Sequence, residues 1–284
     1  MKSLRASRAV AVYLAITIIV LVIGCFGFNF FIGVPKVGIV KVTDVALDQT
    51  TVQKVLSLLK YAGEQKNIRA IVLELDCPGG GAMETEEVYL SLLQLRKKKP
   101  VVASIDKVAL SGGYYVAAAS DFIYAKPTSL VGSIGVWMRL PGPEELKEDV
   151  MASGPAKSTG GVRKKATAWL QTVAEGFLQA VIAQRGGNLK LSKEELSQAE
   201  VYLGVEALRL GLIDKIGTTS EAVEKAAALA GLRNYREVDI NQELKLLLPR
   251  EGFFFSELSS KAGNSGLTKG MYPQYYYLDI RARE

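Results

Sequence analysis

The stretch that decides the fold covers residues 70–81, which read AIVLELDCPGGG. Its first part, Ala70 to Leu75, is a short and largely apolar run, which is typical of a strand buried inside a sheet. The run ends at Pro78 and three glycines, a composition that predicts a tight turn. Such a turn exposes backbone N–H groups directly after the strand. We therefore expect a buried strand whose carboxyl end carries a turn able to bind a ligand.

Strand-like and helix-like segments alternate on both sides of this stretch. Lys36 to Val42, Val101 to Ser104 and Phe122 to Ala125 predict further strands. Apolar residues at helical spacing predict helices over Thr50 to Tyr61 and Glu84 to Lys97. This alternation is typical of an α/β fold with a mostly parallel sheet, which binds ligands at the carboxyl ends of its strands.

The second half of the chain adds helical patterns. Thr167 to Gln184 predicts a long amphipathic helix, Val201 to Ile213 a second helical stretch, and Ser220 to Ala230 an alanine-rich helix. We expect three parts: a cytoplasmic N-terminus with a transmembrane anchor over 1–35, an α/β domain over 36–217, and a C-terminal helical extension and tail over 218–284.

The composition excludes several chemistries. The 284 residues include no histidine, which excludes Ser-His-Asp and Cys-His catalysis and histidine-ligated metals. Cys25 and Cys77 stand far apart, so we expect neither a disulfide framework nor a thiolate metal cluster. The net charge of +6 is spread along the chain, which disfavours nucleic acid as a partner. We expect no metal and no cofactor.

Residues 9–34 form a run of 26 without a charged side chain. As a helix this run would reach about 39 Å, which is enough to cross a bilayer with some tilt. Three basic residues precede it and only Lys36 follows closely, so the positive-inside rule places the N-terminus in the cytoplasm and the remaining chain outside. We expect a single-pass anchor in the cell membrane. The alternatives are a cleaved signal peptide and lipidation at Cys25.

A second glycine-rich turn, residues 111–115 reading SGGYY, follows the strand predicted from Val101. Ser111 would stand at a helix N-terminus, where free N–H groups and the helix dipole stabilise developing negative charge. Taken alone, such a serine is more often an ordinary N-cap. A serine nucleophile without histidine needs another base, and a desolvated lysine is the main alternative. The chain has many lysines, so spacing alone selects none of them.

Three motifs in this order resemble the signal peptide peptidase A family: DCPGG at 76–80, ALSGGYY at 109–115 and GSIGV at 132–136. The likeness spans roughly Lys36 to Asp214. It implies a Clp-protease/crotonase-like α/β fold and a membrane-anchored serine endopeptidase that uses a Ser/Lys dyad and an acyl-enzyme. The dyad would account for the missing histidine.

The resemblance also implies roles for individual residues. Ser111 corresponds to the nucleophile, and residues 153–157, SGPAK, match the motif whose lysine is the base, which nominates Lys157. Lys164 and Lys165 are the fallback candidates for that role. The remaining implied residues are Ser133, which orients the base, and the oxyanion-hole donors Gly80 and Gly112.

The family further implies hydrophobic remnants of signal peptides as substrates, and a homo-oligomer, an octameric ring whose active sites are shared between subunits. Residues 199–204 read AEVYLG, with glutamate at the second position where family members often have an arginine. The contacts between subunits or the fit of the substrate can therefore differ from those of other family members. The tyrosine-rich tail from Met271 to Glu284 suggests a segment that occupies the substrate groove. The alternatives to a peptidase are a crotonase-type acyl-CoA enzyme and a non-catalytic membrane scaffold.

Overall fold

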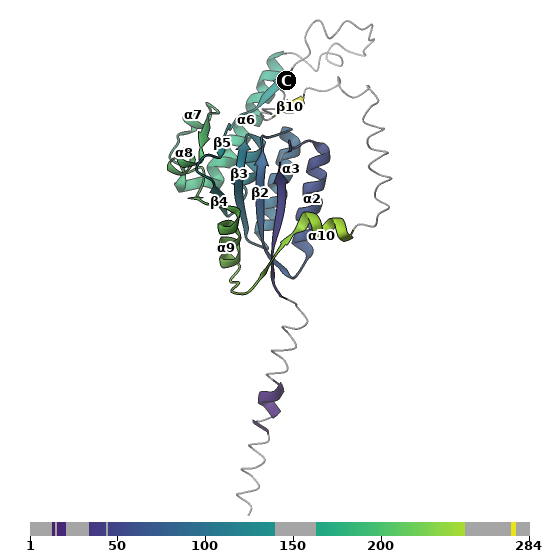
Figure 1. Cartoon of the computed structure of the whole chain (residues 1–284). Coiled ribbons are helices and arrows are strands. Elements are labelled where there is room, and N and C mark those ends of the chain that lie inside the picture. Colours follow the sequence, from purple (N-terminus) through teal and green to yellow (C-terminus); the bar gives the residue numbers. More distant parts are fainter. Residues whose placement is uncertain are drawn as a thin grey trace, which may run out of the picture.

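The computed structural model describes residues 13–14, 16–20, 34–43, 45–139, 163–247 and 274–276. Its centre is a twisted sheet with helices against both faces (Figure 1). The strands follow the order β7-β5-β3-β2-β1-β9, with β4 beside β3 and β8 beside β4. All of these pairs are parallel except β5 with β7. The predicted α/β class with a mostly parallel sheet is confirmed.

The strands of this sheet are β1 (Lys36–Thr43), β2 (Ile68–Cys77), β3 (Val101–Leu110), β4 (Phe122–Ala125), β5 (Leu130–Gly132), β7 (Val201–Leu203), β8 (Lys215–Ile216) and β9 (Arg236–Asp239). A separate two-stranded sheet pairs β6 (Trp137–Arg139) with β10 (Gln274–Tyr276). The helices are α2 (Gln49–Glu64), α3 (Ala82–Arg96), α4 (Gly112–Ala118), α6 (Arg163–Arg185), the 3-10 turn η1 (Gly186–Asn188), α7 (Lys193–Leu196), α8 (Gly204–Arg209), α9 (Thr219–Leu229) and α10 (Ile240–Leu247).

Side chains from alternating positions of β2 fill two cores. Ile71, Leu73 and Leu75 belong to the larger core, which also holds residues of α2, α3, α4 and α6. Ala70 and Val72 belong to the smaller core, which α9 covers. Because both faces of β2 are covered, its sequence is an almost continuous apolar run and not an alternating one.

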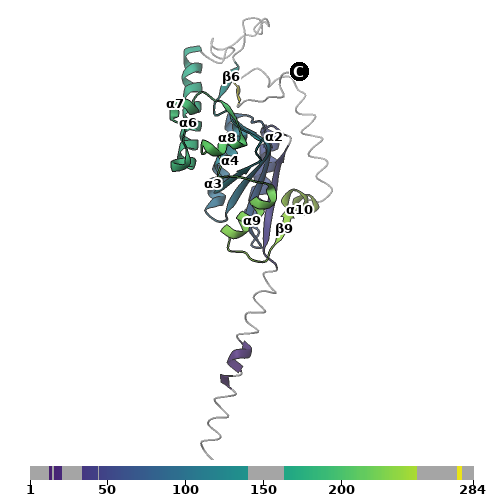
Figure 2. The same cartoon turned by 60° about the vertical axis from the view of Figure 1, so that its left-hand side comes forward.

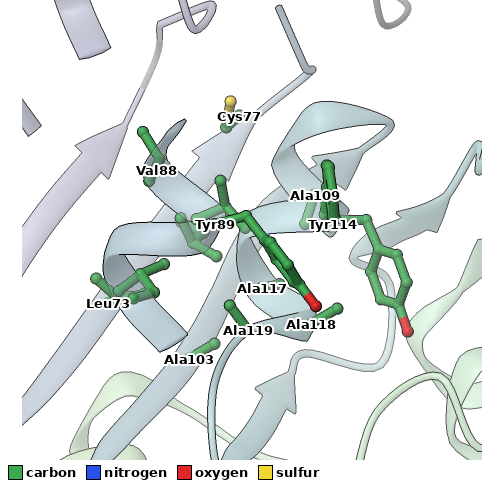
Figure 3. Close-up of a cluster of buried hydrophobic side chains, with 14 of the residues drawn as sticks. Leu73, Cys77, Val88, Tyr89, Ala103, Ala109, Tyr114, Ala117, Ala118 and Ala119 are labelled. Atoms are coloured by element: carbon green, nitrogen blue, oxygen red, sulfur yellow. The ribbon is translucent and has the colours of Figure 1, made fainter. Parts of the chain in front are cut away.

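Aromatic stacking joins three helices in the larger core. The ring of Tyr115 on α4 lies 4.3 Å from that of Tyr89 on α3 and 4.6 Å from that of Phe177 on α6, measured between centroids. Figure 3 shows Tyr89 beside the small side chains Ala117 to Ala119, while the hydroxyl of Tyr114 points away from them. That hydroxyl donates to the carbonyl of Leu212 at 2.8 Å. The adjacent residues Tyr114 and Tyr115 therefore tie α4 to the Leu212 segment and to helices α3 and α6, respectively.

The predicted helical stretch over Val201 to Ile213 is wrong at its start. Val201–Leu203 is a strand that pairs antiparallel with β5, and the helix covers only Gly204–Arg209. The β-branched Val201 and the aromatic Tyr202 favour a strand once a partner edge is present. The short strands β5, β8 and β9 were not predicted, because two to four residues carry too little periodicity.

The described helices and strand between residues 218 and 247 of the predicted C-terminal extension pack on the same sheet. α9 lies against β2 and β3, and β9 adds to the sheet by pairing in parallel with β1. Lys36 at the start of β1 forms a 2.5 Å ion pair with Glu243 of α10. The division of the chain at residue 217 stays a prediction.

Most of the predicted anchor lies outside the described residues. Within it, 13–14 and 16–20 are helical and exposed. Across the part of the chain that the structure describes, no helix combines the length and apolar character needed to cross a bilayer. The membrane anchor stays a prediction.

A buried ion pair joins the end of α6 to the segment before β8. Arg185 binds Asp214 through two hydrogen bonds of 2.8 and 3.0 Å, and its Nε donates to the carbonyl of Gly211. Asp214 also accepts the N–H of Ile123 at 2.8 Å. The two charged side chains are only 4% and 12% exposed, so each depends on the other for compensation.

Removing one partner of this pair should destabilise the fold. Arg185→Met keeps the apolar volume but leaves the Asp214 carboxylate buried without its cation, so we expect the free energy of unfolding to fall by about 3–5 kcal/mol. Urea denaturation followed by circular dichroism measures the change. Lys193→Ala, which breaks the exposed pair with Glu175, is the matched control and should leave the midpoint nearly unchanged. Equal midpoints for the two variants would contradict the assignment.

Candidate active site

The two glycine-rich turns meet because β2 and β3 end side by side. The strands are parallel neighbours, and Cys77 at the end of β2 pairs with Ala109 near the end of β3. Ser111 follows β3 directly, and Gly80 stands three residues beyond the end of β2. The sequence prediction that both turns share one sheet edge is therefore confirmed.

The turn after β2 is held by the segment before α2. The N–H of Leu47 donates to Gly79 at 2.8 Å, and the N–H of Gly81 donates to Leu47 at 3.1 Å. A Cβ on Gly80 would lie 2.3 Å from the Leu47 carbonyl oxygen, so this position requires glycine. Between described residues, the Gly80 N–H makes no such backbone hydrogen bond. The sequence analysis nominates this N–H as a ligand donor.

Ser111 has an unusual backbone conformation, with φ 51° and ψ −118°. A non-glycine residue at positive φ stores strain, which is often found at functional sites. The Ser111 N–H donates to the Gly132 carbonyl at 2.8 Å, and its Oγ donates to the Gly135 carbonyl over a long 3.4 Å. The side chain makes no capping bond to α4. Ser111 therefore occupies the N-cap position of α4, as predicted, but its side chain does not act as an ordinary cap.

Close packing fixes the first turn of α4 against the end of β2. A Cβ on Gly113 would lie 2.2 Å from the carbonyl oxygen of Cys77. Glycine is thus the residue that lets the helix start this near the sheet. The contact sets the spacing between the Ser111-Gly112 peptide and the Gly80 turn.

The GSIGV motif at 132–136 lies at the same sheet edge, because it starts at the end of β5, which pairs with β3. Leu110 pairs with Gly132, so Ser133 stands beside the start of α4. Ser133 also has a positive φ, 53°, and its N–H donates to the Glu200 carbonyl at 2.7 Å. Its side chain is largely buried. The backbone carbonyl of Glu200, directly before β7, therefore supports the turn that carries Ser133.

The structure brings together four of the residues nominated from sequence: Gly80, Ser111, Gly112 and Ser133. The fifth, Lys157, lies outside the described residues. The fallback lysines Lys164 and Lys165 lie exposed at the start of α6, and the Lys165 ammonium stands 4.9 Å from the centre of the Trp169 ring. A lysine base requires desolvation, which neither of these side chains has.

Sequence reasoning missed Leu47, which holds the turn after β2, and Glu200, which holds the turn after β5 that carries Ser133. Both act through main-chain groups, which leave little trace in side-chain identity. Glycines gave an indirect signal, because a Cβ on Gly132 would lie 2.6 Å from the Glu200 carbonyl. Among the described residues, no group of acidic or cysteine side chains is arranged to hold a metal ion.

An apolar cavity of about 610 Å³ adjoins the site. Its wall includes Ala82, two residues after Gly80, and Tyr115, four residues after Ser111. Burial raises the pKa of Tyr115, so this phenol stays neutral. The remaining lining residues come from α3 and α6: Met83, Glu86, Trp169, Thr172, Val173, Gly176 and Phe177. The cavity suits an apolar side chain, and α4, which follows Ser111, contributes Tyr115 to its wall.

Comparisons with known proteins show which family the chain resembles. The profile of "Peptidase family S49" matches residues 93–233. A Synechocystis protein named as a candidate protease, slr0021, is 33% identical over 83% of this chain and 90% of its own length. Protease 4 of Haemophilus influenzae is 29% identical over 70% of this chain and 35% of its own length. An Enterococcus faecium protein named as a candidate signal peptide peptidase SppA is 28% identical over 62% of this chain and 56% of its own length. The chain thus spans about a third of Protease 4 and just over half of the Enterococcus protein.

The close approach of Gly113 to β2 can be tested by adding one methyl group. Gly113→Ala forces a clash with the Cys77 carbonyl, so we expect the free energy of unfolding to fall by about 1–3 kcal/mol. Gly176→Ala is the control, because a Cβ there meets nothing within 4 Å. As a change inside α6 it should stabilise the protein by about 0.5–1 kcal/mol. Thermal melts of both variants give the comparison, and a neutral Gly113→Ala would contradict the packing argument.

Proposed function

Because this chain belongs to peptidase family S49, as an SppA-type member of a family of proteases, we propose that it is a serine endopeptidase with Ser111 as its nucleophile. One observation carries the proposal: the glycine turn after β2, Ser111 after β3 and Ser133 after β5 meet at one sheet edge. A strained serine beside two sets of main-chain donors is the arrangement that acyl transfer requires.

In the proposed first step, the neutral amine of Lys157 accepts the proton of Ser111 while Oγ bonds to the carbonyl carbon of the peptide. The N–H groups of Gly80 and Gly112 stabilise the oxyanion that forms. The C–N bond then breaks, Lys157 returns the proton to the leaving amine, and an acyl-enzyme remains. Water, deprotonated by the same amine, releases the acyl group and restores Ser111.

Lys157 is assigned through its SGPAK motif and through the absence of histidine from the chain. A lysine accepts a proton only when neutral, a state that burial and uncharged neighbours favour. Ser133 supplies such a neighbour, since a hydroxyl orients an amine without adding a charge. In this proposal Ser133 is the positioning residue for the base.

The proposed substrates are hydrophobic peptides, specifically the remnants of signal peptides. The cavity lined by Met83, Val173 and Phe177 supports apolar side chains near the scissile bond. An anchor within residues 9–34 would hold the enzyme at the membrane where such remnants lie, with the catalytic domain on the outer side. Assembly into a homo-oligomeric ring of eight subunits with shared active sites is part of the proposal and is supported by the resemblance to the signal peptide peptidase A family.

The first test is hydrolysis of a fluorogenic apolar peptide by the full-length chain in detergent. Ser111→Ala and Lys157→Ala should each lower kcat by about 10⁴-fold or more, because nucleophile and base act as one unit. Ser120→Ala, which changes another buried serine, should retain full activity.

The outcomes separate the competing interpretations. Activity that survives Lys157→Ala but is lost in Lys164→Ala or Lys165→Ala would move the base to α6. A folded but inactive wild-type protein would contradict the peptidase proposal, and acyl-CoA binding would then identify a crotonase-type enzyme. Inactivity without acyl-CoA binding would favour a scaffold.

A second prediction isolates Ser133. Ser133→Ala removes one hydrogen bond to the base, so we expect kcat to fall roughly tenfold while KM changes little. The pH dependence of kcat should shift at the same time, because the environment of the lysine changes. Steady-state kinetics between pH 6 and about 10 measure both effects, the range being chosen to bracket a lowered lysine pKa. An unchanged pH profile would show that Ser133 has no role in positioning the base.

A further inference from the structure

One carboxylate interrupts the apolar wall of the cavity that adjoins the candidate site. The cavity, of about 610 Å³, is lined by residues of α3, α4 and α6. α6 packs against α4 and is the long helix on its outer side in Figure 2. Among the described residues that line the cavity, Glu86 of α3 alone carries a charge. The wall therefore combines a mainly apolar surface with a single negative group.

The Glu86 carboxylate is not used within the fold. In the described part of the chain it makes neither a hydrogen bond nor an ion pair, and its side chain is exposed to water. Its charge nevertheless acts on the cavity wall. Burial raises the pKa of Tyr115, and the nearby Glu86 carboxylate raises this pKa further. Glu86 thus places negative potential beside the Tyr115 ring and has no cation of its own to neutralise it.

Aromatic rings make up much of the same wall. Tyr115, Trp169 and Phe177 all line the cavity. The face of an aromatic ring attracts a cation, and the Trp169 ring already does so, because the Lys165 ammonium stands 4.9 Å from its centre. Lys165 itself is not among the lining residues. Rings together with a carboxylate are the groups that recognise an ammonium or a guanidinium.

The chemistry of the wall favours a side chain with an apolar stem and a basic end. A purely apolar side chain gains from the wall but removes water from the Glu86 carboxylate without replacing it. Lysine and arginine can lay their aliphatic stems along Met83 and Val173 and bring their charge to Glu86. The volume lies in the range of pockets that hold whole drug-sized ligands, so the longest side chains fit.

We propose that this cavity is a subsite for one basic side chain of the substrate and that Glu86 is the residue that selects it. The inference rests on the proposed peptidase function and narrows its substrate class to peptides in which lysine or arginine adjoins an apolar stretch. Signal peptides have this composition, because a positively charged n-region precedes their apolar h-region. Glu86 then directs binding to the junction between the two regions.

The test compares peptides that differ by one ammonium group. A fluorogenic apolar peptide carries lysine at each position in turn, or norleucine, which has the same straight stem without the charge. With the full-length chain in detergent, lysine at one position should raise kcat/KM roughly tenfold over norleucine, mainly through KM, because the ion pair and the aromatic contact are made on binding. Glu86→Gln should remove this preference.

Glu87→Gln is the matched control. It removes the same charge from the next residue of α3, which is exposed and does not line the cavity, so the lysine preference should persist. Glu86→Lys should reverse the preference, so that a peptide with glutamate at that position is hydrolysed better than its lysine counterpart. Equal hydrolysis of lysine and norleucine peptides at every position would overturn the inference while the peptidase activity still stands. A lysine preference that survives Glu86→Gln would overturn it as well.

A binding measurement tests the subsite without activity. Fluorescence anisotropy of the same peptides, labelled, is followed on the full-length chain carrying Ser111→Ala. At low salt one lysine peptide should bind roughly tenfold more tightly than its norleucine counterpart. The difference should shrink at about 1 M salt, where charges are screened beyond about 3 Å. Equal affinities at low salt would contradict the subsite, whether or not any peptide is hydrolysed.

Discussion

The parallel register of β2 and β3 is the constraint on which the rest of the structure depends. It places Cys77 beside Ala109, so the turns that follow both strands start from the same level of the sheet. The missing side chain of Gly113 then allows α4 to begin against the Cys77 carbonyl. A shift of one residue would turn buried side chains to the wrong face of the sheet and would separate Gly80 from Ser111.

The sequence was informative where a strand is buried along its whole length and less so elsewhere. Residues 70–75 predicted the centre of β2, because both faces of that strand are covered by helices. β3 was predicted only to Ser104 but extends to Leu110. Its middle carries Asp106 and Lys107, where the strand changes partner from β4 to β5. Polar residues at such a junction mask the strand pattern.

The candidate site likewise has residues that the sequence predicted and residues that it did not. Ser111, Gly80, Gly112 and Ser133 could be nominated because the required residue types stand in short motifs next to predicted strands. The contributions of Leu47 and Glu200 are carbonyl oxygens, which any residue can supply, so no pattern identifies them. Their positions follow from chain topology, which places segments distant in sequence against the turn after β2 and the turn after β5. Only the tertiary structure reveals that kind of contribution.

The hydrogen bond from Ser133 to Glu200 has a consequence for biosynthesis. A nascent chain that has been made only as far as Arg185 already contains Ser111 and Ser133, but it lacks the residues that hold the third turn in its left-handed conformation. Contacts between such distant segments form late in folding. The proposed hydrolytic centre therefore has all of its supporting backbone only after most of the polypeptide has been translated.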